Sequence, residues 1–177
     1  MKNIIICGLI GTGKTTLAKK VSQNLNYNYI DLNKKVNTDT FESDKEFLSK
    51  KLRQQIDNYI YKLKNSVIDC EYLILPNDYS NYLSKDICDI IYLGFYDVDI
   101  NILYDKFVQD YKSKGKKYDE TDLLNQLKYF KKISEKIYND CKKYGYKFFD
   151  ISKDKSIVLE EIYSYIETLH TKNNLLQ

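Results

Sequence analysis

The sequence has little of several residue types on which particular classes of protein depend. It contains one proline and six glycines in 177 residues, which excludes collagen-like and linker-rich architectures. No apolar run approaches the ~18 residues that a membrane-spanning helix needs. The apolar start of the chain, residues 3–7, is too short for a secretory signal. We therefore expect a cytoplasmic protein with no membrane partner.

Metal-binding and disulfide patterns are also lacking. The sequence has one histidine, His170, and four cysteines that form no C-x-x-C pair: Cys7, Cys70, Cys88 and Cys141. All four cysteines stand in apolar surroundings, so we predict reduced, buried thiols that act as small hydrophobic residues. We predict that His170 is exposed near the end of a helix.

The charge of the chain is nearly balanced. Lys and Arg number 28 and Asp and Glu number 25, a net charge of +3, which argues against a nucleic-acid partner. Hydrophobic residues make up 43% of the chain, enough for a packed core. At roughly 150 residues per domain, residues 1–177 should form a single domain.

Short apolar runs alternate with helical patterns along the chain. Five runs predict strands: Asn3–Cys7, Tyr27–Leu32, Ser66–Cys70, Ile87–Leu93 and Lys147–Ile151. Three- and four-residue spacing of apolar residues predicts long helices at 44–64, 121–144 and 154–169, with shorter ones at 15–24 and 99–111. Gly145 suits the left-handed residue after a helix. The alternation predicts a three-layer α/β/α domain with a five-stranded parallel sheet, and ligands at the carboxyl ends of the strands.

A phosphate-binding loop (P-loop) follows the first predicted strand. Residues 8–16, GLIGTGKTT, satisfy G-x-x-x-x-G-K-[ST], between a strand and an amphipathic helix. The glycines let backbone N–H groups converge on phosphate oxygens, and the helix start adds positive charge. Lys14 should reach the β- and γ-phosphates, and the Thr15 hydroxyl should bind Mg²⁺. The residues expected to bind the nucleotide are Gly8, Gly11, Thr12, Gly13, Lys14, Thr15 and Thr16.

The stretch GLIGTGKTTLAK, from Gly8 to Lys19, resembles the opening of the nucleoside-monophosphate-kinase-like branch of P-loop kinases. This branch includes adenylate, shikimate and dephospho-CoA kinases. The resemblance implies ATP and Mg²⁺ as cofactors. It also implies a helical acceptor region at about residues 33–64 and a lid at about residues 112–120.

Asp31 ends the second predicted strand, beside the P-loop. A carboxylate there can orient an attacking hydroxyl or metal-bound water, although a turn or helix-capping role is the alternative. Shikimate kinases have a D-x-D pattern at this place. Asp31 matches its first acid, but Asn33 replaces the second, and the glycine triplet of that family is missing after the third strand. These two departures argue against shikimate itself as the acceptor.

The third predicted strand ends in acidic residues. The apolar run of the strand leads to Asp69 in the Walker-B pattern, an acid at the end of a buried strand next to the P-loop, and Glu71 follows two residues later. Either Asp69 or Glu71 could support the magnesium or act as a base, and Glu71 is also expected to bind the substrate. A solvated loop acid is the alternative interpretation of each.

Two basic features lie in the regions that the resemblance assigns to acceptor and lid. Arg53, the only arginine, suits bidentate binding of an anionic acceptor, or is an ordinary surface arginine. The lysines of the lid, Lys114, Lys116 and Lys117, stand where such kinases have arginines and could neutralise the transferring phosphate. A solvated basic loop or a small polynucleotide contact are the alternatives for that run.

The sequence thus predicts a phosphotransferase that moves the γ-phosphoryl group of ATP to a small-molecule acceptor. Lys14, Asp31 and Asp69 are the expected catalytic residues, with Thr15 and Asp69 on the metal. A nucleoside, a nucleotide or a related metabolite is the acceptor that the resemblance favours. The alternatives are an NTP-binding regulatory module, or a kinase that acts on a polynucleotide end or as a toxin.

Overall fold

A five-stranded parallel sheet forms the centre of the computed structural model, which describes residues 2–35, 57–71 and 87–175. Its strands lie in the order β2-β3-β1-β4-β5, and every neighbouring pair is parallel. The strands are β1 (Asn3–Gly8), β2 (Asn28–Asp31), β3 (Ser66–Cys70), β4 (Cys88–Gly94) and β5 (Lys147–Asp150). The predicted fold class is confirmed, and all five predicted strands are present.

The sequence of the strands explains their order in the sheet. Every residue of β1 and β3 is buried, as expected of continuous apolar runs that are covered on both faces. The two strands at the edges, β2 and β5, are partly exposed and carry polar residues at their ends. The most apolar strands therefore occupy the middle of the sheet.

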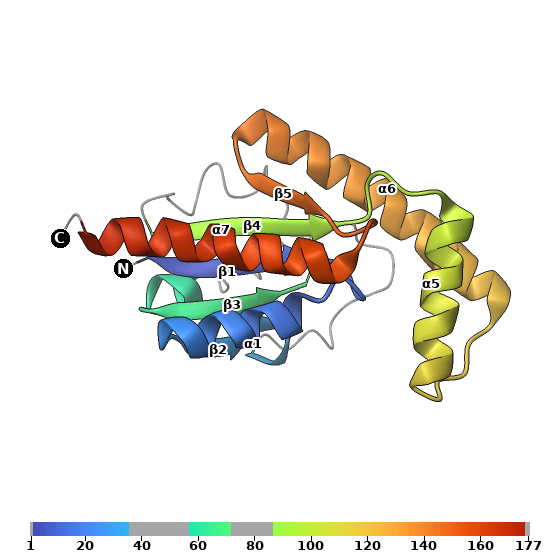
Figure 1. Cartoon of the computed structure of the whole chain (residues 1–177), viewed down its shortest axis with the longest axis horizontal. Helices are drawn as coiled ribbons and strands as arrows, with labels where there is room; N and C mark the ends of the chain where they lie inside the picture. The colour runs from blue at the N-terminus through green and yellow to red at the C-terminus, as the bar shows by residue number, and fades with distance from the viewer. Residues whose placement is uncertain (1, 36–56, 72–86, 176–177) are drawn as a thin grey trace.

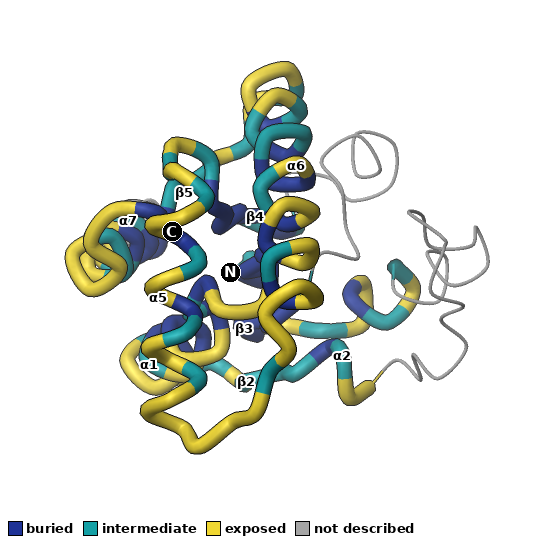
Figure 2. Tube along the Cα trace, turned by 90° about the vertical axis from the view of Figure 1, so that its right-hand side faces the viewer, coloured by how far each residue is buried: buried dark blue, intermediate teal, exposed yellow. Residues whose placement is uncertain are grey.

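Helices cover both faces of the sheet (Figures 1 and 2). On one face, α1 (Lys14–Leu25) packs on β3 and β2 and lies beside α7 (Lys155–Leu175). On the other face, α6 (Glu120–Tyr144) packs on β4 and β5 and contacts α5 (Ile100–Ser113). Figure 2 shows the buried sides of these helices turned inward and their exposed sides turned to solvent. The three layers place the core between the sheet and the helices.

The long helix α6 begins and ends at residues that the sequence marks. The side chain of Asp119 accepts a hydrogen bond of 3.0 Å from the backbone N–H of Asp122, which caps the first turn. Gly145 follows the helix with a φ of 71°, which confirms its predicted left-handed conformation. The helix predicted at 44–64 lies partly outside the described residues. Its described part covers residues 57–61 and ends three residues earlier than predicted.

The strands all point to one end of the molecule. The P-loop follows β1 there, and α5 stands beyond the carboxyl ends of the strands, while both chain termini lie at the opposite end (Figure 1). The carboxyl ends of the strands and the P-loop therefore lie at one end of the sheet, where ligands of such folds bind.

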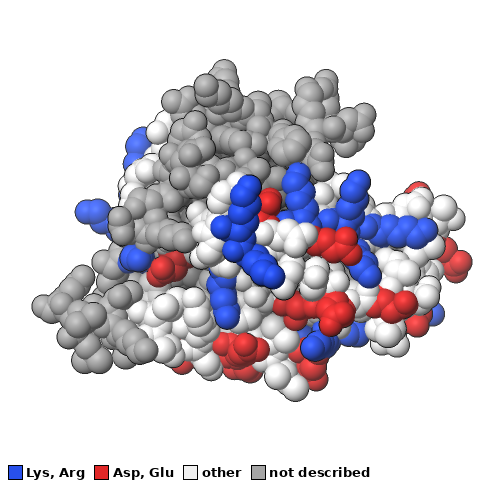
Figure 3. All heavy atoms as spheres, turned by 90° about the horizontal axis from the view of Figure 1, so that it is seen from above, with Lys and Arg blue, Asp and Glu red and all other residues white. Residues whose placement is uncertain are grey.

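The outer surface mixes charges of both signs. Viewed from above, lysine side chains gather in a band that is bordered by acidic side chains (Figure 3). Among the residues that the structure describes, no helix is both long enough and apolar enough to cross a membrane.

The prediction that His170 is exposed was wrong. His170 is 4% exposed, with Nδ1 3.3 Å from the hydroxyl oxygen of Tyr27 and Nε2 3.3 Å from Oδ2 of Asp89. Burial, followed by the charge of Asp89, raises the pKa of Tyr27. The helix is longer than the periodicity predicted, so His170 reaches back over the amino ends of the strands.

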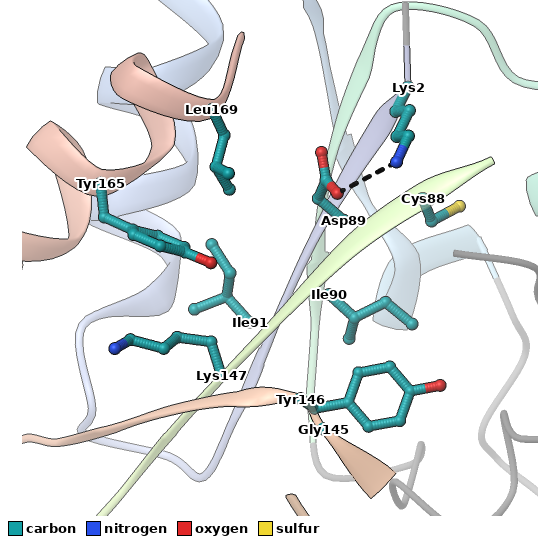
Figure 4. Close-up of a pocket in the computed structure, with 10 residues that line it drawn as sticks. All are labelled: Lys2, Cys88, Asp89, Ile90, Ile91, Gly145, Tyr146, Lys147, Tyr165 and Leu169. Carbon is teal, nitrogen blue, oxygen red and sulfur yellow. Dashed lines mark ion pairs between the residues drawn. The ribbon is translucent and has the colours of Figure 1, made fainter. Parts of the chain in front are cut away.

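Asp89 also borders a small cavity at this end of the sheet. The cavity has a volume of about 220 Å³, and Lys2 lies 3.8 Å from Asp89 at its edge (Figure 4). Tyr146, just before β5, and Tyr165 of α7 line it. The contacts of Asp89 therefore join the beginning of the chain, β4 and the last helix.

We expect His170→Ala to lower the free energy of unfolding by about 1–3 kcal/mol, because it removes a buried side chain and its polar contacts with the half-buried Tyr27 and Asp89. Chemical denaturation measures this loss. Glu161→Ala, at an exposed position of the same helix, is the matched control and should change stability little. Equal stabilities of the two variants would show that the contacts of His170 do not hold α7 on the sheet.

Candidate active site

The P-loop owes its shape to two glycines with left-handed backbone angles. Gly11 has a φ of 85° and Gly13 a φ of 91°, conformations that side chains with a Cβ rarely adopt. Between them, the buried Thr12 donates a hydrogen bond of 2.8 Å from Oγ1 to the carbonyl oxygen of Leu9. The loop is thus closed on itself and turns its backbone towards the start of α1.

The start of α1 is left free to bind an anion. Gly13 precedes the helix and has no side chain to cap it, and the first turn holds no acidic residue. The first N–H groups of a helix lack partners within the helix and carry partial positive charge. An uncapped helix start that follows a glycine loop is a site for phosphate groups.

Lys14 adds a full positive charge to this site. Its side chain is only 7% exposed, and its hydrogen bond among the described residues is a long one, 3.4 Å from Nζ to the carbonyl oxygen of Leu9. A buried ammonium group is costly unless it is paired with charge. A phosphate oxygen would therefore be a stronger hydrogen-bond acceptor for Lys14 than the carbonyl oxygen of Leu9.

The acid at the end of β3 lies directly beside the P-loop. Asp69 is 2% exposed, and its Oδ2 accepts hydrogen bonds from the hydroxyls of Thr15, at 2.6 Å, and Tyr29, at 3.2 Å. Burial, followed by the charges of Asp69 and Asp31, raises the pKa of Tyr29 to about 12. The phenol of Tyr29 therefore stays protonated and holds the carboxylate in place.

Thr15 and Asp69 fit a magnesium ion. Oδ1 of Asp69 is buried and has no hydrogen-bond partner among the residues that the structure describes. A hydroxyl and a carboxylate are oxygen ligands of the kind that Mg²⁺ prefers, with phosphate oxygens and water completing the shell. No cluster of three or more His, Cys, Asp or Glu side chains occurs within the described ranges, so these residues form no all-protein metal cage.

Asp31 lies beside Asp69, on the neighbouring strand. The two residues are register partners of β2 and β3. Asp31 accepts a hydrogen bond of 3.3 Å from the backbone N–H of Lys34 and forms an ion pair of 3.4 Å with the Lys34 ammonium. It therefore caps the short helix α2 (Leu32–Lys35), and its catalytic role remains a prediction.

A hydrogen bond between Asn33 and Glu71 joins α2 to the residue that follows β3. The side-chain oxygen of Asn33 accepts a hydrogen bond of 3.2 Å from the backbone N–H of Glu71. The amide at position 33 thus fixes the chain just after β3. Asp69, rather than Glu71, has its carboxylate against Thr15, and a substrate-binding role for Glu71 stays untested.

A cavity of about 550 Å³ opens beside the P-loop. Gly11 forms part of its wall and α5 another part, and the chain after β5 completes it. The ring of Phe107 lies so close to Gly11 that an added Cβ would stand 2.6 Å from it. Asp150 accepts hydrogen bonds from the backbone N–H groups of Tyr96 and Asp97, which ties the loops after β4 and β5 together.

The segment predicted to be a lid connects α5 to α6. Lys114 follows α5 and pairs with Asp110 at 2.6 Å, and it borders the 550 Å³ cavity. Lys116 and Lys117 are exposed in the connecting turn. Lys114 is thus the residue of this run that lies near the P-loop. The lid function of the segment stays a prediction.

Part of the predicted acceptor region lies outside the described residues. This holds for Arg53 and for most of the helical region at 33–64. The structure does bring together Lys14, Thr15 and Asp69, which the motifs marked, and it adds Tyr29. No motif signals Tyr29, since its role depends on a contact between neighbouring strands.

Comparison with known proteins gives the family. Residues 10–144 match the family model described as shikimate kinase. The chain belongs to the shikimate kinase family. A shikimate kinase of Caldanaerobacter subterraneus subsp. tengcongensis is 40% identical over 75 residues, which cover 38% of this chain and 44% of that protein. The match thus spans less than half of the length of that relative.

Solved structures of low sequence identity share the fold. A shikimate kinase from Bacteroides thetaiotaomicron superposes with a TM-score of 0.64 at 18% identity, covering 96% of this chain and 98% of the other. A gluconokinase from Sinorhizobium meliloti also has a TM-score of 0.64, at 11% identity, with 99% and 97% covered. These two matches confirm the fold, and the family match over residues 10–144 confirms the expected placement in the P-loop kinase branch.

The geometry of Asp69 makes a prediction about metal dependence. In Asp69→Asn the amide keeps the size of the side chain but loses its charge. The factor by which Mg²⁺ raises the affinity for ATP should therefore be smaller than in the parent, by about tenfold or more. Calorimetric titration of ATP with and without Mg²⁺ measures the difference. Glu71→Gln is the control, because its carboxylate is not the one on Thr15. A full magnesium effect in Asp69→Asn would remove Asp69 from the metal site.

Proposed function

We propose that this protein is an ATP- and Mg²⁺-dependent kinase that transfers the γ-phosphoryl group to a hydroxyl of a small metabolite. The observation that carries the proposal is the uncapped start of α1 beside the buried Lys14, with the hydroxyl of Thr15 on the carboxylate of Asp69. Together these groups offer fixed positive charge for phosphates and oxygen ligands for a metal. Membership of the shikimate kinase family supports the same reaction.

The protein groups act mainly by position and charge. Backbone N–H groups of the P-loop and α1 bind phosphate oxygens, and the Lys14 ammonium offsets the charge that develops on the transferred phosphoryl group. Thr15 and Asp69 would hold Mg²⁺, which would supply positive charge to neutralise the phosphates. These groups are already in place before the nucleotide binds, so little reorganisation is required at the moment of transfer.

The acceptor should approach from the side of β2. Asp31 is the register partner of Asp69, and its carboxylate is half-buried with Lys34 as its cationic partner. It can accept a hydrogen bond from an acceptor hydroxyl and orient that oxygen towards the γ-phosphate. The family makes shikimate the first acceptor to assay, while Asn33 in place of the second acid makes other hydroxylated metabolites necessary in the same panel.

An assay of ATP consumption across a panel of acceptors tests the proposal. We expect ADP to form faster with one member of a panel of shikimate, gluconate and nucleosides than with ATP alone. Lys14→Ala should lower this acceptor-dependent rate at least ~10²-fold, because a charge aimed at the transition state is lost. The control is Lys62→Ala, which removes an exposed lysine outside the P-loop.

Two outcomes would contradict the proposal. Near-normal turnover of Lys14→Ala would exclude the P-loop from the reaction. Tight ATP binding by the parent, with no acceptor of the panel raising ATP consumption, would favour a nucleotide-binding regulatory protein instead.

A further inference from the structure

Lys155, the first residue of α7, lies against the P-loop. Its Nζ donates a hydrogen bond of 2.7 Å to the carbonyl oxygen of Gly11. Its Cε stands 2.8 Å from the position that a Cβ at Gly13 would occupy. The side chain therefore lies along Gly11 and Gly13, the two glycines of the loop with left-handed backbone angles. This is the part of the loop that would surround phosphate groups.

The backbone of Lys155 is fixed by the cap of its helix. Asp154 accepts hydrogen bonds from the backbone N–H groups of Ser156, at 2.9 Å, and Ile157, at 3.3 Å. The flexible part of Lys155 is thus the four-carbon side chain alone. An ammonium on such a side chain can move by a few ångströms without disturbing the helix.

The surroundings of Lys155 are rich in positive charge. Lys106, Lys114 and Asp110 border the same cavity, and Asp110 forms an ion pair with Lys114. Partial removal from water lowers the pKa of Lys155; the charge of Asp110 raises it and that of Lys114 lowers it. The present partner of Lys155 is a neutral carbonyl, and a phosphate oxygen that carries negative charge is a stronger acceptor for an ammonium.

We propose that Lys155 is a phosphate-binding residue, which leaves the Gly11 carbonyl and binds the β- or γ-phosphate when the nucleotide enters. This inference rests on the proposed function, because it assumes that the P-loop holds a nucleoside polyphosphate. It gives the site a second mobile cation in a chain whose single arginine, Arg53, is distant from this loop in sequence. Nothing in the P-loop motif marks a residue so far along the chain.

A purely structural role makes a different prediction. If Lys155 only ties α7 to the P-loop, its loss should lower stability and should weaken all adenine ligands alike. The chain offers a matched control in Lys20 of α1, which also ties to α7, through a hydrogen bond of 2.6 Å to Glu160. Lys20 and Glu160 are exposed, so this tie contributes little to stability.

The experiment compares ligands that differ in phosphate number. Binding of ATP, ADP and AMP is measured by titration calorimetry on the parent, Lys155→Gln, Lys155→Arg and Lys20→Gln, with AMP measured by competition. We expect Lys155→Gln to weaken ATP and ADP about tenfold or more, the worth of a charge-assisted hydrogen bond, and to leave AMP within about twofold. Lys155→Arg should restore most of the loss, and Lys20→Gln should match the parent for all three ligands.

The outcomes separate this inference from the proposed function. An equal loss for ATP and AMP in Lys155→Gln, or no loss, would overturn the phosphate role. If the parent binds ATP but phosphorylates no acceptor, the kinase proposal fails while the result for Lys155 stands. If the parent fails to bind ATP, both are overturned. Thermal unfolding of each variant shows whether a change in affinity follows from a change in stability.

Discussion

The hydrogen bond from the hydroxyl of Thr15 to the carboxylate of Asp69, 2.6 Å long, joins the first turn of α1 to the end of β3. These two elements are distant in sequence but pack against each other, because β1, which leads through the P-loop into α1, is the neighbour of β3 in the sheet. The bond holds a carboxylate beside a positively charged loop in a buried setting, where Coulomb interactions are strong. The proposed metal site depends on this contact, and the pairing of β2 with β3 places Asp31 beside Asp69.

Buried charge at this end of the sheet needs an external partner. Within the described part of the chain, Lys14 makes a long hydrogen bond of 3.4 Å to the carbonyl oxygen of Leu9, and Oδ1 of Asp69 has no hydrogen-bond partner. Leaving such groups unsatisfied costs stability. A nucleotide that brings phosphate oxygens and a metal would satisfy both groups at once. The unsatisfied groups therefore lower the stability of the free protein and favour the binding of a polyphosphate. Such a trade between stability and function is usual at an active site.

Much of the fold and the P-loop could be predicted from the sequence, because both depend on local patterns. Continuous apolar runs mark the inner strands, and Gly145 marks the end of α6. Contacts between distant segments could not be predicted in this way. The burial of His170 depends on where α7 meets β4, and the place of Lys155 depends on where that helix meets the P-loop. The spacing of apolar residues predicts the helix, but it does not predict which residues of the sheet the ends of the helix contact.

The central claim is that the γ-phosphate of ATP moves to an acceptor and not to water, and ³¹P NMR of a complete reaction tests it most directly. Parent protein, ATP, Mg²⁺ and the acceptor panel are followed until ATP is consumed. The account predicts a new phosphomonoester resonance that matches the ADP formed, one for one. Inorganic phosphate equal to the ADP formed, with no phosphomonoester, would contradict it.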